Sequence, residues 1–143
     1  MSDVMEPFIL RLGVEVPHDV IFVTVHHSVK ILPDEVFRDR FQLREVNLPE
    51  GLEEIGEEAF CRCESLERIN YPSTLIKIGP GAFCSCFQPN EVTLPEGLEE
   101  FGEEAFAGCE SLERINCPST LINIGNGAFK MCRSLVKVTL AGG

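Results

Sequence analysis

The sequence has few positive charges, because 12 Lys and Arg stand against 23 Asp and Glu and give a formal net charge of -11. A chain this acidic repels a phosphate backbone instead of releasing its counterions, so we expect no nucleic-acid partner. Long apolar runs are also lacking, since stretches such as residues 20–25 are far shorter than the ~20 residues of a membrane-spanning helix. We therefore expect no membrane insertion.

The sequence also lacks a signal peptide, and it lacks the even number of cysteines expected when all are paired in disulfides. The first residues, MSDVMEPF, have neither a basic start nor an apolar stretch. Seven Cys is an odd number, which favours reduced thiols. These features predict an intracellular, cytoplasmic protein. With 143 residues, 44% of them hydrophobic and 24% charged, the chain has the composition of one soluble domain with a modest core.

Most of the chain repeats every 23 residues. LPEGLEEIGEEAFCRCESLERIN begins at Leu48 and returns from Leu94 with 20 of 23 positions identical. Related segments begin at Tyr71 and Cys117, and a weaker copy begins at Val25. The sequence therefore predicts five repeats within residues 25–140, preceded by residues 1–24 as an N-terminal cap with a first strand. The five units are 25–47, 48–70, 71–93, 94–116 and 117–139, and residues 140–143 are the truncated start of a sixth.

Equivalent positions of stacked units form columns, and the apolar columns predict the core. The main columns are Phe37, Phe60, Phe83, Phe106 and Phe129; Leu52, Leu75, Leu98 and Leu121; Ile55, Ile78, Phe101 and Ile124; and Ala59, Ala82, Ala105 and Ala128. Gly56, Gly79, Gly102 and Gly125 form a further column, where we expect either a positive φ or a close backbone approach. The spacing L-x-x-I-x-Ω predicts one short strand per unit in a parallel sheet.

The composite motif L-x-x-I-x-L-P-x-x-L-x-x-I-G-x-x-A-F-x-x-C covers about residues 20–140 and resembles the BspA-type leucine-rich repeat. This resemblance implies a curved leucine-rich-repeat solenoid with a parallel β-sheet on one face and short extended or single-turn helical segments on the other. It also implies a binding surface without catalytic residues. Two positions depart from the motif, because Pro89 replaces the first Leu of the third strand motif and Arg40 replaces the Cys of the first unit. We expect Pro89 to weaken its coil, since proline lacks the N–H that a ladder uses.

The cysteines are the main candidates for reactive chemistry. Cys63, Cys86, Cys109 and Cys132 share one column, which favours buried packing. Cys61 and Cys84 lie outside that column, so a four-sulfur zinc site with Cys63 and Cys86, or a disulfide between Cys61 and Cys84, is an alternative interpretation. The C-x-x-C spacing of zinc sites is absent, and no nucleophile–His–acid set or phosphate-binding glycine loop is present. We therefore expect no catalytic residues, no metal and no cofactor.

Charge is unevenly distributed among the units. It is -5 in residues 48–70 and -6 in residues 94–116, but +3 in residues 117–139 and -3 in residues 1–24. The glutamates of the two acidic units lie away from the strand motif. We interpret them as a solvated face, with docking of a basic partner or weak Ca²⁺ binding as the alternative.

The strand motif supplies the candidate partner-binding face. One column alternates in charge along most of its length, and the next column is polar. The residues of this face are Glu45, Asn47, Arg68, Asn70, Glu91, Thr93, Arg114, Asn116, Lys137 and Thr139. Opposite charges on neighbouring strands help to fix the register without any ligand.

From these patterns we predict a non-enzymatic protein-interaction module that presents its solenoid surface to a protein partner. The alternatives are a structural spacer or surface-adhesion array without a tuned site, and a metal or redox module built on the cysteines. The sequence also predicts self-association, because the last strand motif is followed only by AGG and leaves an uncapped C-terminal end.

Overall fold

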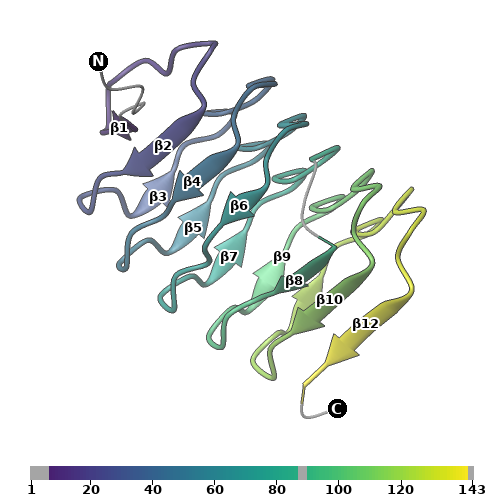
Figure 1. The fold of residues 1–143 in the computed structure, drawn as a ribbon. Helices are drawn as coiled ribbons and strands as arrows, with labels where there is room; N and C mark the ends of the chain where they lie inside the picture. The colour runs from purple at the N-terminus through teal and green to yellow at the C-terminus, as the bar shows by residue number, and fades with distance from the viewer. Residues whose placement is uncertain (1–6, 87–89, 142–143) are drawn as a thin grey trace.

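Each 23-residue unit forms one coil of a solenoid in the computed structural model, which describes residues 7–86 and 90–141. Seven strands lie on one long side, called here the front face (Figure 1). They are β1 (Phe8–Leu10), β2 (Phe22–Val25), β4 (Glu45–Asn47), β6 (Arg68–Ile69), β8 (Glu91–Thr93), β10 (Arg114–Cys117) and β12 (Lys137–Leu140). All ladders on this face are parallel.

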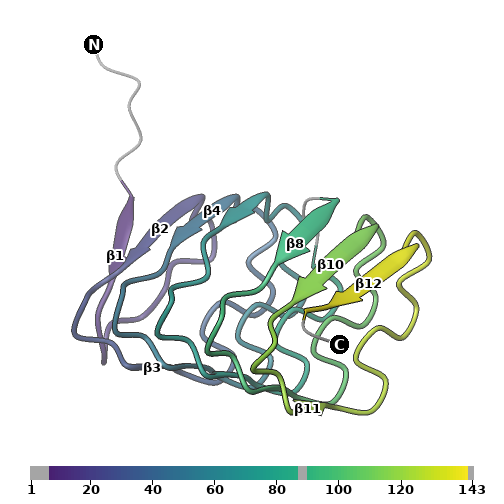
Figure 2. The same cartoon turned by 90° about the horizontal axis from the view of Figure 1, so that it is seen from below.

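A five-stranded sheet lies on the opposite side, called here the back face (Figure 2). Its strands have two residues each and pair in the order β11-β9-β7-β5-β3. They are β3 (Ile31–Leu32), β5 (Glu54–Ile55), β7 (Lys77–Ile78), β9 (Glu100–Phe101) and β11 (Asn123–Ile124). The strand motif thus forms the predicted parallel strand of each unit on the front face, and the Ile column adds a second, two-residue strand that the sequence did not indicate.

No helix is present in residues 7–86 and 90–141. Of the two forms that the family resemblance allowed for the second face, the extended one is confirmed and the single-turn helix is wrong. The backbone N–H groups between the two faces alternate in their acceptors. Phe60 N donates to Ala82 O of the next coil at 2.8 Å, whereas Cys61 N donates to Glu58 O of its own coil at 3.1 Å. The inter-coil bonds form a third ladder beside these turns.

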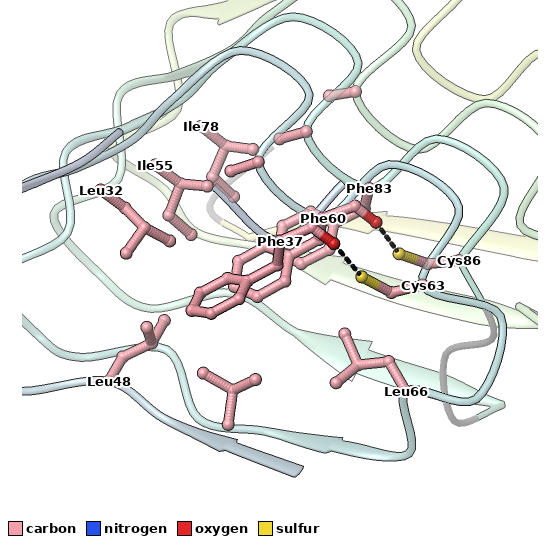
Figure 3. Packing of buried hydrophobic residues seen from close by; sticks show 14 of the residues in the cluster. Leu32, Phe37, Leu48, Ile55, Phe60, Cys63, Leu66, Ile78, Phe83 and Cys86 are labelled. Carbon is pink, nitrogen blue, oxygen red and sulfur yellow. Dashed lines mark hydrogen bonds between the residues drawn. The ribbon is translucent and has the colours of Figure 1, made fainter. Parts of the chain in front are cut away.

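The core contains the predicted columns except in the last coil, where Ile124 is 44% exposed and Leu121 and Phe129 are only partly buried, because no further coil covers them in the described residues. Phe37, Phe60, Phe83 and Phe106 are fully buried. Their rings stack, with centroids 5.1 Å apart for Phe60 and Phe83 (Figure 3). The centroids of Phe83 and Phe106 are 5.4 Å apart. This spacing matches the distance between neighbouring strands, so the phenylalanine column follows the solenoid axis.

The glycine column is explained by a close backbone approach. A methyl group on Gly102 would lie 2.6 Å from the backbone nitrogen of Pro80, and one on Gly79 would lie 2.9 Å from the carbonyl oxygen of Ile55. Neither residue has a positive φ. Of the two reasons that the sequence offered for this column, the structure therefore selects the close approach.

Left-handed backbone occurs instead in two other columns of the turns between the back and front faces. Glu35, Glu58, Gly81, Glu104 and Gly127 form the first of these columns, and Asp39, Arg62, Ser85, Gly108 and Met131 form the second. Their φ values lie between 52° and 73°. Each coil therefore turns twice through a conformation that favours glycine, although most of these residues are not glycine.

The N-terminal coil covers the first repeat. Leu10, Val16 and Val20 are buried against the core. Arg40 fastens this coil, because its Nε donates to Pro17 O at 3.0 Å and its Nη2 donates to Val16 O at 2.8 Å. The replacement of the column cysteine by Arg40 is thus explained by contact with the N-terminal coil.

The front face consists of two separate sheets. One contains β1, β2, β4 and β6, the other contains β8, β10 and β12, and the described residues form no ladder between β6 and β8. The predicted weak point at Pro89 lies outside the described residues. The interruption falls between the two units of the first 46-residue block, residues 48–70 and 71–93.

Candidate interaction surface

The predicted partner-binding residues lie on the outer side of the front face. In β4, Val46 points into the core while Glu45 and Asn47 point outward, and the parallel register repeats this alternation on the other strands. Glu45 pairs with Arg68, and Arg114 pairs with Glu91 and Lys137. The sequence columns therefore become spatial rows across the strands.

Two ion pairs form within the charged row. Arg68 Nη1 lies 3.7 Å from Glu45 Oε2, and Arg114 Nε lies 3.7 Å from Glu91 Oε2. Both pairs are largely exposed, so each contributes at most about 1 kcal/mol to stability. Their main effect is to fix the register and to set an alternating charge pattern on the surface.

The row is not continuous. Arg68 and Glu91 belong to different sheets, so the expected side-by-side arrangement does not extend across the interruption. Lys137 lies beside Arg114 with the same charge. The face is therefore divided into a first patch (Glu45, Asn47, Arg68, Asn70) and a second, more basic patch (Glu91, Thr93, Arg114, Asn116, Lys137, Thr139).

The polar row is mostly occupied by hydrogen bonds within the protein. The Asn70 side chain accepts a bond from Leu48 N and donates one to Leu48 O, each at 2.8 Å. Asn116 Nδ2 donates to Thr93 Oγ1 at 3.0 Å and to Glu91 Oε2 at 3.3 Å. These bonds hold the amides in fixed orientations.

The front face also carries two apolar side chains that were not among the predicted partner-binding residues. Ile9 follows the polar row, because it pairs with Thr24, and it is 47% exposed. Phe22 is half-buried and pairs with Glu45 in the charged row. The outward position of Phe22 could have been predicted from the sequence Phe22-Val23-Thr24-Val25, because an alternating strand that buries Val23 and Val25 turns Phe22 outward.

The seven cysteines are free thiols, and the column cysteines take part in core packing. Cys63 Sγ donates to Phe37 O at 3.1 Å and Cys86 Sγ donates to Phe60 O at 2.7 Å (Figure 3). Cys109 and Cys132 repeat this bond one and two coils further on. These sulfurs therefore serve as small hydrogen-bonded core groups.

Cys61 is also buried, beside Cys84. Burial and the neighbouring Cys84 raise the pKa of the Cys61 thiol to about 12. A thiol with a raised pKa is a weak metal ligand and a slow nucleophile near neutral pH. Within residues 7–86 and 90–141 no group of three or more His, Cys, Asp or Glu side chains is arranged to hold a metal ion.

Two glutamates of the acidic segments join neighbouring coils. Glu50 accepts bonds from Ser73 N at 3.2 Å and Ser73 Oγ at 2.8 Å. Glu96 makes the same pair of contacts with Ser119. Each bond pair lies inside one 46-residue block, so these carboxylates tie the two coils of a block together.

The fold and its columns define a leucine-rich-repeat solenoid. Residues 20–142 match the family model of the BspA type leucine rich repeat region in six copies. The chain belongs to this family.

Solved structures show the same architecture. The chain is similar to a leucine rich cell surface protein from Faecalibacterium prausnitzii, with 27% identity and a TM-score of 0.85 over 96% of this chain and 36% of that one. It is also similar to a leucine-rich repeat protein from Bacteroides ovatus, with 26% identity and a TM-score of 0.81 over 92% and 36%. The pneumococcal vaccine antigen PcpA matches at 26% identity and a TM-score of 0.68 over 80% and 29%.

The chain thus spans about a third of the length of these solved structures. No curated protein sequence matches it. The part of the chain that the structure describes has no helix long and apolar enough to span a bilayer.

Proposed function

We propose that this repeat scaffold is a non-catalytic interaction module that binds a protein partner on the front face. The observation that carries the proposal is the row of outward charges held in register by two ion pairs, next to a row of hydrogen-bonded amides and hydroxyls. Such a surface presents fixed charges and fixed hydrogen-bonding groups over several coils, as extended solenoid surfaces do. Ile9 and Phe22 add apolar contact area at its N-terminal end.

The partner expected for this surface carries charges that alternate with a spacing close to that between strands. Complementary charges at an interface chiefly set specificity and association rate. A β-strand or extended loop that crosses the front strands fits this requirement, because it meets Glu45 and Arg68, or Glu91 and Arg114, in succession.

Charge reversal tests the proposal. Affinity purification with the intact chain and cross-linking identifies bound proteins, and titration calorimetry then compares the wild type with Arg68→Glu and Arg114→Glu. We expect each of these variants to weaken binding at least about tenfold, which corresponds to ~1.4 kcal/mol. Lys77→Glu on the back face is the matched control, because Lys77 also lies within 4 Å of a glutamate, at 3.6 Å from Glu100. Equal affinity in all four proteins would disprove the front-face assignment.

A structural array is the second candidate function. It is favoured by the fact that the front-face charges satisfy one another, and by the near identity of the segments that begin at Leu48 and Leu94. The F. prausnitzii relative is described as a cell surface protein, which is a setting in which spacer or adhesion arrays occur. Surface proteolysis and antibody labelling of intact cells would distinguish this function from that of a cytoplasmic binding module.

A further inference from the structure

Two cysteines outside the core column lie on neighbouring coils. Cys61 and Cys84 occupy equivalent positions of the second and third repeats, residues 48–70 and 71–93. Arg62 N donates to Cys84 O at 2.8 Å, so the two backbones run side by side in register here. The Cys61 and Cys84 thiols also interact directly. Neighbouring parallel chains lie about 4.8 Å apart, which is within the Cα–Cα range of about 4.4–6.8 Å that a disulfide allows.

Packing does not require cysteine in the column that contains this pair. The second and fourth repeats are nearly identical, but where the second has Cys61 the fourth has Ala107. The two residues are equally buried, each being 7% exposed. Other coils have Arg38 and Lys130 in the same column. The thiol pair is therefore a local feature of two coils and not part of the repeat motif.

The pair also differs from the core cysteines in its access to solvent. Three cysteines of the core column are at most 2% exposed and donate to backbone carbonyl oxygens, namely Cys63, Cys86 and Cys109. Cys84 is half-buried, and its Sγ lies 3.9 Å from the Ser85 hydroxyl instead. A small oxidant in solution can therefore reach Cys84, whereas Cys61 is buried beside it.

The same two coils meet where the front face is interrupted. β6 belongs to the second repeat and β8 to the third, and no ladder joins them within residues 7–86 and 90–141. All other neighbouring repeats are joined by ladders on both faces. A covalent bond between Cys61 and Cys84 would therefore join the two repeats at the junction where the front ladder is interrupted.

We propose that Cys61 and Cys84 are an oxidation site, at which a hydroperoxide forms a reversible disulfide between the second and third repeats. The Cys84 thiolate attacks one oxygen of hydrogen peroxide, which breaks the O–O bond, releases hydroxide and leaves a sulfenic acid on Cys84. The Cys61 sulfur then attacks the Cys84 sulfur, the S–O bond breaks, and the oxygen leaves as water with the Cys61 proton. Two thiols and one peroxide thus give one disulfide and two waters.

The positions of the two sulfurs suit these separate roles. Burial raises the pKa of the Cys61 thiol, so Cys61 is a slow nucleophile toward reagents in solution. Contact with Cys84 compensates for this, because a neighbouring group reacts as if it were present at a very high concentration. Two equivalents of a thiol such as glutathione reverse the reaction by exchange.

Peptide mapping tests the site. The purified chain is treated with hydrogen peroxide, the remaining thiols are blocked with N-ethylmaleimide, and tryptic peptides are analysed without reduction. Trypsin cuts after Arg62 and separates Cys61 from Cys63, and fragmentation of the linked peptide distinguishes Cys84 from Cys86. We expect the Cys61–Cys84 link as the main product and its loss after dithiothreitol.

Variants separate the two roles. In Cys61→Ala, dimedone should trap the sulfenic acid on Cys84, whereas Cys84→Ala should leave Cys61 as a free thiol. Cys132→Ser is the control, because Cys132 is the other half-buried cysteine and donates to Phe106 O, a bond that serine can keep. It removes a competing oxidation and should still form the Cys61–Cys84 link. Thermal melts followed by circular dichroism check that each variant is folded.

The crosslink should also stabilise the junction. We expect the oxidised wild type to melt at least about 5 °C above the reduced protein, because the bond restricts the unfolded chain. Neither alanine variant should show this shift.

Two results overturn the proposal. If peroxide forms no disulfide, or links Cys109 to Cys132 while Cys61 and Cys84 stay reduced, this pair is not the oxidation site. If the Cys61–Cys84 link forms but leaves the melting temperature unchanged, the bond does not hold the two repeats together.

Discussion

Phe83 lies at the centre of the phenylalanine column and touches rings on three sides. It stacks on Phe60 and Phe106, and Tyr71 meets it edge to face with centroids 6.0 Å apart. The column could be predicted from the sequence because phenylalanine recurs every 23 residues, and this period is visible without knowing the conformation of the turns. It could not identify the Tyr71 contact, since Tyr71 is the one tyrosine in the chain and the equivalent positions of the other units carry Val, Leu or Cys.

We expect Phe83→Ala to lower the free energy of unfolding by about 3–5 kcal/mol, because it leaves a cavity between two stacked rings. Urea unfolding measures this loss. Phe41→Ala is the control, since Phe41 is 50% exposed, and it should cost far less. A change of under about 0.5 kcal/mol for Phe83→Ala would mean that the column does not stabilise the fold.

Cys132 is expected to be the most reactive thiol. The Cys109 thiol lies within reach of two acceptors, the Phe83 carbonyl oxygen at 3.1 Å and the Cys132 sulfur. Donation to Cys132 lowers the pKa of that thiol to about 7, whereas burial and Cys84 raise the pKa of Cys61 to about 12. Cys132 is also only half-buried.

Alkylation by iodoacetamide, followed by peptide mass spectrometry, tests this order. The rate at Cys132 should rise with pH and level off above about pH 7, because the thiolate is the nucleophile. Cys109→Ala should move the midpoint of this pH dependence at Cys132 to higher pH, because it removes the thiol that donates to Cys132. The expectation fails if Cys61 reacts first, or if the midpoint at Cys132 stays unchanged in that variant.

At the scale of single elements, the turns contain most of what the sequence could not show. A two-residue strand such as β5 gives only one alternation, so no period of two was visible in Glu54-Ile55. The two columns of left-handed backbone could not be predicted, because glutamate occupies the first of them in three coils and glycine in only two. Their conformation is imposed by the inter-coil hydrogen bonds on both sides, as from Glu58 N to Pro80 O at 2.9 Å.

Met131→Gly should raise the free energy of unfolding by up to about 1 kcal/mol, because a left-handed conformation is strained for a residue with a side chain. Met131 has a φ of 62° and is 54% exposed, so little packing is lost. Gly108 already occupies the same column in the preceding coil. Urea unfolding again provides the measurement.

Gly127→Ala is the reverse change and should lower the free energy of unfolding by a similar amount. Its φ is 64°, and the nearest atom to an added methyl group is Glu104 Cγ at 3.4 Å, so strain and not collision would cause the loss. If Met131→Gly destabilises the protein, the turn does not hold this residue in the left-handed region.

The candidate surface was predicted only in part. The 23-residue period places Glu45 beside Arg68 and Glu91 beside Arg114, and the structure shows both pairs. The same period also placed Arg68 beside Glu91, but the ladder is interrupted there. A period describes equal coils, so the only indication in the sequence that this coil departs from its neighbours was Pro89, which breaks the repeat motif.

For the whole molecule, that interruption divides the front face between β6 and β8, inside the first 46-residue block. We expect local opening to begin there, because among residues 7–86 and 90–141 β8 has a ladder partner only in β10. Native-state hydrogen exchange should be faster in Glu91–Thr93 than in Arg114–Cys117. Pro89→Leu should raise the melting temperature and slow this exchange; an unchanged or lower melting temperature would contradict the expected role of Pro89.

The direction of the ladders also decides how the protein would respond to tension. β1 and β12 lie at opposite ends of the solenoid, and the strands run across the line that joins them (Figure 1). A pull along this line opens the few hydrogen bonds of one coil at a time, so the coils unzip in succession instead of shearing together. Each 23-residue coil that opens would lengthen the chain by roughly 75 Å. Single-molecule stretching should therefore give many small, low-force steps of similar size, the response of an extensible tether and not of a rigid rod.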